Sequence, residues 1–529
     1  TNAGDTMTIG FGSVKTKDIG LGSRASLSAS AVTTTALTTG DLLINGVEVG
    51  ASLATDDKVS SASNSGSAIA KAAAINRVSD LTGVKATVGA TTAYGAAMTA
   101  AATSGTITIN GVTTATVYTT TDTEISRSAI ATAINQIASQ TGVKAVNTHD
   151  DKQGIVLVAE DGRNIDIGAL SGLTAAATGL DATSAKTTVG TYSLNTNDGS
   201  SITISSKVGG ALDSSGLAAG TFKADTAETV SKARAVASAA PTASTTGILN
   251  GNTLIINDVQ VDAAIASDDT ASDTAAASGT KAASAIAIAA AINKKSGLTG
   301  VTAKAEANVV SGSGFAAGNV TNIYLNGVTI SADFTVNTTR AEVIEKFNTY
   351  SGQTGVVASE NGAGIKLTAA DGRNISIGAG GAEGALGLTG SGISATATAA
   401  AATTSYAKVS LSSDKAFSVK SGSEGNTNFA LLGFRAGTFG GADNGQKIAT
   451  VDVSTVSGAT NAIKAIDAAL DTVAGMEAKA GAYQNRLDAV VSNLTESNQN
   501  MSASRSRILD TDYATETTAM ARSQIVAQA

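Results

Sequence analysis

The chain has 529 residues, which is too long for one ordinary domain, so three or more domains are expected. It has no cysteine, one histidine, 15% charged residues and a net charge of −8. This composition excludes disulfides and thiolate metal sites, argues against multi-histidine zinc sites, and disfavours nucleic acid or an anionic membrane as partner, because phosphate groups attract clustered basic residues.

The first pattern along the chain is a short hairpin that occurs four times. In each copy an Asn-Gly pair, or Asn-Asp in the third, lies between alternating apolar residues, and this is a strong hairpin signal because both turn residues take positive φ. The four segments are 43–47, 107–112, 255–259 and 324–328.

Each hairpin is followed by a predicted helix and then by a second strand. Apolar residues four apart, such as Ile130 and Ile134, or Val343 and Phe347, share one helical face. A Thr-Gly-Val triplet then ends each helix and opens the strand, because glycine is a natural C-terminal stop. These triplets are at 82–84, 141–143, 299–301 and 354–356.

The first and third copies, and the second and fourth, are separated by roughly 210–217 residues. Further segments recur at a similar spacing, including Asp161–Asn164 and Asp371–Asn374. The sequence therefore predicts a duplicated unit that holds two modules of hairpin, helix and strand. The expected fold class is multidomain α+β, with duplicated small β-rich domains.

No segment of the chain predicts catalytic chemistry. The Asp-Gly-Arg-Asn segments are interpreted as tight turns in which Gly and Asn take positive φ. His149 is interpreted as a solvated loop residue, and residues 312–318 miss the dinucleotide-binding fingerprint by one position. We therefore expect no catalytic, cofactor-binding or metal site, and no enzyme. No apolar run is long enough to predict a membrane span.

After Gly440 the pattern changes to long coiled-coil-like helices that run toward the end of the chain. Ser457 or Thr460 is expected to cap the first of them. Steps of three and four between apolar residues give a narrow seam, as in a coiled coil or bundle, and such a helix needs partner helices to bury it. The predicted packing residues are Ile463, Ile466, Leu470, Val473, Leu487, Val490, Leu494, Met501 and Ile508.

This region resembles the bacterial flagellins. Residues 481–487 read GAYQNRL and match the family's GAxQNRF, with Leu487 in place of phenylalanine. Residues 502–516 match its SAARSRIxDxDYAxE. Residues 452–455 and 462–470 match the family segment DISTxxGAxxAIxxIDxAL, which precedes these motifs at the start of the helical region. The resemblance covers roughly 90 residues. Polar residues of these motifs are expected to make contacts between core helices: Gln484, Asn485, Arg486, Arg505, Arg507, Asp510, Asp512 and Glu516.

The resemblance implies a structural subunit of the extracellular flagellar filament that serves swimming motility. It implies self-assembly with other copies, contacts with an export chaperone and with cap or junction proteins, and recognition by a host flagellin-sensing Toll-like receptor. Exposed Ser and Thr are then possible O-glycosylation acceptors. The chain begins without Met and stops before the family's last helix, so we expect the N-terminal helices and the extreme C-terminal helix to be missing.

The corresponding domain prediction has four parts. They are a β segment of the core-proximal domain (1–24), two outer units of two modules each (25–235 and 236–440), and a helical core domain (441–529). Two alternatives stay open. One is a hook-filament junction protein of the same superfamily. The other is a surface adhesin for glycans or host tissue, for which a chain with no Trp and 3% aromatic residues has few stacking groups.

Overall fold

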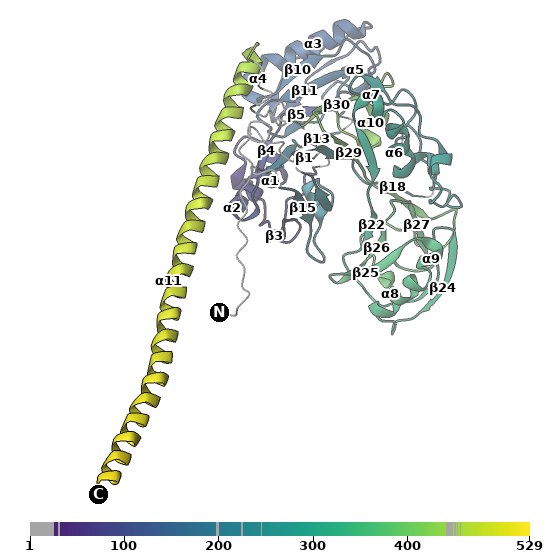
Figure 1. The fold of residues 1–529 in the computed structure, drawn as a ribbon. Coiled ribbons are helices and arrows are strands. Elements are labelled where there is room, and N and C mark those ends of the chain that lie inside the picture. Colours follow the sequence, from purple (N-terminus) through teal and green to yellow (C-terminus); the bar gives the residue numbers. More distant parts are fainter. Residues whose placement is uncertain are drawn as a thin grey trace. The chain divides into compact units, whose positions relative to one another are not determined.

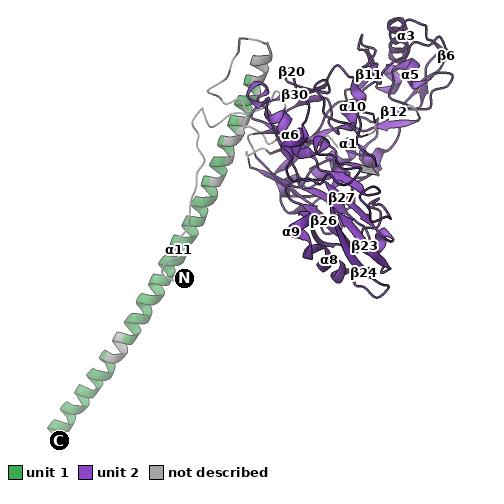
Figure 2. Cartoon of the chain, turned by 90° about the vertical axis from the view of Figure 1, so that its right-hand side faces the viewer, with its two compact units in different colours: residues 1–21, 446–529 green, residues 22–445 purple. Residues whose placement is uncertain are grey.

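The computed structural model describes residues 26–29, 32–182, 184–196, 200–223, 226–237, 239–244, 246–440, 448, 451, 453–454 and 456–529. It is a mixed α+β structure with many small sheets and one long C-terminal helix (Figure 1). The chain divides into two compact units, and Figure 2 colours them separately. Residues 22–445 form the β-rich unit, and the long helix belongs to the other. The predicted β segment 1–24 lies outside the described residues.

All four predicted hairpins are confirmed. Their turn residues have positive φ, for example 51° and 79° at Asn45 and Gly46, and 48° and 62° at Asn257 and Asp258. The strand pairs are β2 (Leu43–Ile44) with β3 (Val47–Glu48), β7 (Thr108–Ile109) with β8 (Val112–Thr113), β19 (Leu254–Ile256) with β20 (Val259–Gln260), and β23 (Val320–Leu325) with β24 (Val328–Phe334).

A covering helix follows each hairpin, as predicted. These helices are α1 (Ala68–Asn76), α3 (Thr123–Gln136), α6 (Ala285–Asn293) and α8 (Arg340–Thr349). Side-chain oxygens of Ser67, Asp122, Ser284 and Thr339 cap their N-termini.

One further turn follows each covering helix and ends at a glycine with φ near 70°, as the Thr-Gly-Val triplets indicate. The turns are α2 (Ser79–Thr82), α4 (Ala138–Thr141), α7 (Ser296–Thr299) and α9 (Ser351–Thr354). The strands after them are β4 (Val84–Val88), β10 (Lys144–Asn147), β21 (Thr302–Ala305) and β25 (Val357–Asn361).

The hairpin and the strand after the helix belong to different sheets, and the helix packs between them. In the first module, Ile44 of the hairpin, Ile75 of α1 and Val84 of β4 are buried in one apolar core. The third module repeats this core with Ile256 and Ile292. The second and fourth modules each have a core of their own.

The modules are nested. The chain leaves the first module after β4, builds the second, and returns as β14 (Tyr192–Thr196), which pairs with β4. It likewise leaves the third module after β21, builds the fourth, and returns as β29 (Val409–Ser413), which pairs with β21. The same order of elements therefore occurs twice.

A six-stranded sheet joins the two halves of the β-rich unit. Its order is β21-β29-β17-β1-β14-β4, with β1 (Ser26–Ala29) and β17 (Ala227–Val230) as a parallel pair at its centre. On each side of that pair the next strand is antiparallel, so β14 and β29 take equivalent places. Four strands of this sheet (β1, β4, β14 and β17) lie within the predicted unit 25–235 and two (β21 and β29) within 236–440, so one continuous sheet contains strands from both predicted outer units.

Smaller sheets complete the modules. They contain β5 (Thr91–Ala93), β6 (Ser104–Gly105), β9 (Val117–Tyr118), β11 (Ile155–Ala159), β12 (Ile165–Ile167), β13 (Lys186–Thr188), β15 (Ile202–Ser205), β16 (Gly220–Phe222), β18 (Arg234–Ala237), β22 (Asn308–Ser311), β26 (Gly364–Ala369), β27 (Ile375–Ala379), β28 (Thr403–Tyr406), β30 (Phe417–Ser421) and β31 (Gly437–Phe439). Two more short helices are α5 (Ala175–Thr178) and α10 (Asn426–Leu431).

The turns at 161–164 and 371–374 differ from the prediction in one residue. Gly162 and Gly372 have positive φ, as expected, but the asparagines do not and are fully buried. The Asn164 side chain donates to the carbonyl oxygens of Ala62 (2.9 Å) and Ser63 (3.2 Å). Asn164 therefore holds the inserted second module against the first, because its amide satisfies buried carbonyl groups there.

The C-terminal helix α11 (Val456–Gln528) is continuous over 73 residues and passes through Gly481. It begins at Val456, so Ser457 and Thr460 lie inside the helix and the prediction that one of them caps it is wrong.

Candidate interaction surfaces

The apolar seam of α11 lies open along most of its length. Leu494 is 54% exposed and Ile508 73% exposed, and the other large residues of the seam are exposed as well. Val473 is partly buried. The exposed members are Ile463, Ile466, Leu470, Leu487, Val490, Leu494, Met501 and Ile508.

Heptad spacing aligns the central part of the seam. The steps from Leu487 through Leu494 and Met501 to Ile508 are seven residues each, and Val490 lies between the first two. A seven-residue apolar repeat is typical of helices that supercoil around a partner. Burying one leucine side chain fully stabilises a structure by about 1.5–3 kcal/mol relative to leaving it exposed. Burial of the whole seam against partner helices would therefore stabilise an assembly strongly.

At its start, α11 presents a second face of small residues. Ala462, Ala465 and Ala469 are buried, whereas Ile463 and Ile466, about 100° further around the helix, are exposed.

The polar residues predicted to contact core helices are mostly exposed. Gln484, Asn485, Arg486, Arg505, Arg507 and Glu516 all lie open on α11. The side chains of Asp510 and Asp512 lie outside the described residues. The predicted contacts with core helices therefore stay a prediction.

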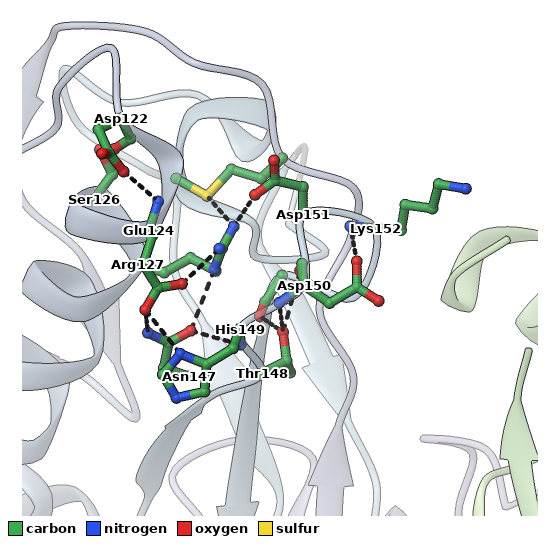
Figure 3. A network of polar contacts seen from close by, with 12 residues as sticks. Asp122, Glu124, Ser126, Arg127, Asn147, Thr148, His149, Asp150, Asp151 and Lys152 are labelled. Carbon is green, nitrogen blue, oxygen red and sulfur yellow. Dashed lines mark hydrogen bonds and ion pairs between the residues drawn. The ribbon is translucent and has the colours of Figure 1, made fainter. Parts of the chain in front are cut away.

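In the β-rich unit, Arg127 on α3 is the centre of the polar network in Figure 3. Its buried guanidinium contacts Glu124 at 2.7 Å, Asn147 at 3.2 Å and Asp151. Hydrogen bonds from Arg127 hold the pKa of Glu124 and of Asp151 below their usual range. The network ties the loop after β10 to the covering helix.

His149 lies in that loop and is largely exposed, as expected for a loop histidine. Its Nδ1 lies 2.8 Å from Oε1 of Glu124, and its backbone has a φ of 56°. In the fourth module Arg340 occupies the place of Arg127 and contacts Glu360 at 3.0 Å. An arginine that anchors a strand end at the same place in two modules indicates a structural role.

Within the described ranges, no three His, Cys, Asp or Glu side chains gather where a metal ion would bind. No helix in the described part of the chain is both long and apolar enough to cross a membrane.

Sequence reasoning identified the hairpin asparagines as turn residues but missed the hydrogen bonds of their side chains. The Asn45 amide donates to the Thr82 carbonyl oxygen (2.9 Å) and accepts from the Thr203 N–H (2.8 Å). Asn110, Asn257 and Asn326 make the same pair of bonds to their own neighbours. The signal was present, because Asn is retained in the third hairpin although the glycine after it is not.

Comparison with known proteins places the C-terminal helix in a family. Residues 463–529 match the bacterial flagellin C-terminal helical region. The chain is 30% identical to the B-type flagellin of Pseudomonas aeruginosa over 210 residues, which are 36% of this chain and 41% of that protein. It is 45% identical to flagellin B of Vibrio cholerae over 91 residues, 17% of this chain and 24% of that protein.

The polar flagellin B/D of Vibrio parahaemolyticus is 36% identical over 131 residues, 24% of this chain and 34% of that protein. The chain thus spans less than half the length of these relatives. The family is structural and not enzymatic, in agreement with the absence of a predicted catalytic site. The comparisons therefore show that the C-terminal part of this chain is similar to the C-terminal helical region of bacterial flagellins.

Proposed function

We propose that the chain is a structural subunit of the extracellular flagellar filament, which assembles with other copies of itself and serves swimming motility. The observation that carries the proposal is the exposed heptad seam of α11, within the residues that match the flagellin family. An exposed seam of this length is satisfied by partner helices, and a filament of identical subunits supplies them.

In this proposal residues 441–529 belong to the helical core of the filament, and 1–24 to the domain next to it. Residues 25–235 and 236–440 are the two outer units, exposed on the filament surface. The recurrence of hairpin, helix and strand in both, with the six-stranded sheet between them, supports a rigid outer body.

The proposed partners follow from the same assignment. They are other copies of the chain, an export chaperone before assembly, cap and junction proteins, and a host flagellin-sensing Toll-like receptor that recognises the segment Gly481–Leu494 with its neighbouring helix. The apolar residues of the seam are proposed to pack between subunits. The polar residues predicted within Gln484–Arg486 and 505–516 are proposed to make contacts between core helices.

The test is filament assembly by seam variants. Leu487→Asp or Leu494→Asp places a carboxylate in a helix interface, where burying it without a partner costs several kcal/mol. We expect cells that express either variant in the full-length protein to form no filaments, while the outer units stay folded. Ser492→Asp is the matched control, because Ser492 is exposed and lies about 140° around the helix from Leu487. Normal filaments from both leucine variants would contradict the proposal.

A further inference from the structure

The first and third modules expose a leucine at the same place in their helix-ending turn. Leu81 in α2 is 75% exposed, and Leu298 in α7 is 73% exposed. The second and fourth modules have the same turn with the same backbone hydrogen bond, but Gln140 and Gln353 occupy the position. The turn therefore folds without an apolar side chain, and the exposed leucine needs another explanation.

A second apolar residue and an ion pair accompany each leucine. In the first module these are Leu53 and the Asp56–Arg77 pair (2.8 Å). In the third module they are Ile265 and the Asp268–Lys294 pair (2.6 Å). We call these groups the first end patch (Leu53, Asp56, Arg77, Leu81) and the third end patch (Ile265, Asp268, Lys294, Leu298).

Hydrogen bonds join Leu53, Asp56 and Arg77 of the first end patch, and Leu81 lies next to them in the chain. Asp56 accepts from the backbone N–H of Leu53 at 3.2 Å and from Arg77, which is the C-cap of α1. Leu81 follows within one turn of Arg77. Lys294 is likewise the C-cap of α6, and Leu298 follows it. The patches thus lie at the C-terminal ends of equivalent helices.

Duplication by itself does not explain why both modules keep the leucine. The neighbouring positions in the same turn have changed, from Val78 to Lys295 and from Asp80 to Gly297. In the second and fourth modules the position of Arg77 and Lys294 holds uncharged Gln136 and Thr349. Apolar and charged character is retained together in the first and third modules and absent together from the other two.

We propose that the two end patches bind neighbouring copies of this chain, so that outer units contact one another; this inference rests on the proposed filament function. Each patch carries one carboxylate and one cation between two apolar residues, so it complements itself. In a first-to-third contact Asp56 of one copy faces Lys294 of the next, and Arg77 faces Asp268. Such a head-to-tail contact continues from copy to copy, as filaments require.

The charge balance of the patches favours a second copy over other partners. A nucleic acid or an anionic lipid surface selects clustered basic residues, whereas each patch has no net charge. The first and third end patches contain the same types of residue. Each chain can therefore contact one neighbour through the first patch and another through the third.

Cross-linking in assembled filaments tests the contact. The chain has no cysteine, so single cysteines report without background. In filaments from cells that express Leu81→Cys together with Leu298→Cys, we expect oxidation to produce ladders of linked subunits. The control is Val336→Cys, which replaces a 66% exposed apolar residue outside both patches. Ladders no stronger than those of the control would overturn the proposal.

A glutamine variant tests the energetics without unfolding the modules. Leu81→Gln with Leu298→Gln introduces the residue that the second and fourth modules carry in this turn, and unchanged thermal unfolding of the chain checks the fold. We expect filaments to form but to depolymerise on heating or dilution at least 10-fold faster than wild-type filaments. Depolymerisation of the variant at the wild-type rate would overturn the proposal. So would a filament in which the end patches bind a different protein and the subunits do not cross-link. Failure of the proposed filament function would be recognised separately: the wild-type chain would form no filaments, or the α11 seam variants would form normal ones.

Discussion

Asn76, the last residue of α1, and Ala86 in β4 are joined by two hydrogen bonds. The Asn76 side-chain amide donates to the Ala86 carbonyl oxygen (2.9 Å) and accepts from the Ala86 N–H (2.8 Å). The amide imitates a neighbouring strand and fixes each helix end to the strand that follows. The same two bonds join Asn135 to Ala145, Asn293 to Ala303, and Asn348 to Ala358.

The first prediction is that Asn135→Leu destabilises the second module. It leaves the backbone N–H and carbonyl of Ala145 without their partner, and a buried polar group without a partner costs about 1–3 kcal/mol. Hydrogen exchange of Lys144–Asn147 should accelerate, and the urea midpoint of this module should fall. Gln136→Ala is the control, because Gln136 is exposed at the same helix end and should change little. Equal effects of the two variants would contradict this account.

The second prediction concerns Lys71, a buried lysine in α1. Its Nζ donates to the Thr33 carbonyl oxygen at 2.7 Å, and burial lowers its pKa to about 7. The equivalent residue of α6 is buried Ile288. The unfolded chain binds the proton more tightly than the folded chain, so stability rises with pH between the folded pKa near 7 and the unfolded pKa near 10.5.

Lys71→Ile removes this pH dependence. We expect the variant to be more stable than wild type at pH 6–7, with the difference shrinking by up to about 1.4 kcal/mol per pH unit as the pH approaches 10. Chemical unfolding at a series of pH values measures the difference. A constant difference across this range would show that the folded chain keeps Lys71 protonated.

The third prediction is that Arg127→Met weakens the acid dependence of the second module. The pKa values of Glu124 and Asp151 are lowered by hydrogen bonds from Arg127. Their stabilising effect is therefore present above the unfolded pKa of a carboxyl group, near 4, and is lost as the pH falls through the lowered folded values. The variant should lose less stability than wild type on acidification below pH 4. Lys144→Met, which breaks the exposed pair with Glu160, is the control.

The sequence predicted what short-range chemistry determines. Asn-Gly turns, helix caps and Thr-Gly-Val stops each lie within a few residues, so the hairpins, covering helices and following strands could be located. The pairing of β1 with β17, or of β14 with β4, joins strands far apart in the chain. Strands of four or five residues rich in Ser, Thr and Ala carry too little pattern to specify such partners.

The same distinction separates the candidate surface that could be predicted from the contact that could not. The α11 seam could be located because one helix carries the whole periodicity. The Asn164 contact could not, because its partners Ala62 and Ser63 belong to another module and enter only as carbonyl oxygens.

The fourth prediction follows from this contact. Asn164→Ala removes the amide that holds the second module against the first, and we expect protease cleavage within 93–182 at a rate several times that of wild type. Asn374→Ala should act in the same way on the fourth module, because it removes the side-chain amide that donates to the Thr280 carbonyl oxygen. Asn337→Ala, in an exposed loop, is the control and should leave both modules resistant.

The last prediction contrasts the two units of these 529 residues in dilute solution. The modules have buried cores of their own, so residues 43–378 should show strong protection in hydrogen exchange. The α11 seam is exposed in a single copy, and an unpartnered amphipathic helix is marginal in water. Residues 461–528 should therefore exchange much faster.

Sedimentation should show a small species under the same conditions, because in the proposed function the seam is covered only when subunits assemble. Leu494→Ala provides a control, since removing an exposed side chain from an unpartnered helix should not change the exchange of either unit. Strong protection of α11 in a monomer would mean that the chain buries its seam internally, and filaments of these residues alone would mean that the seam is sufficient for assembly.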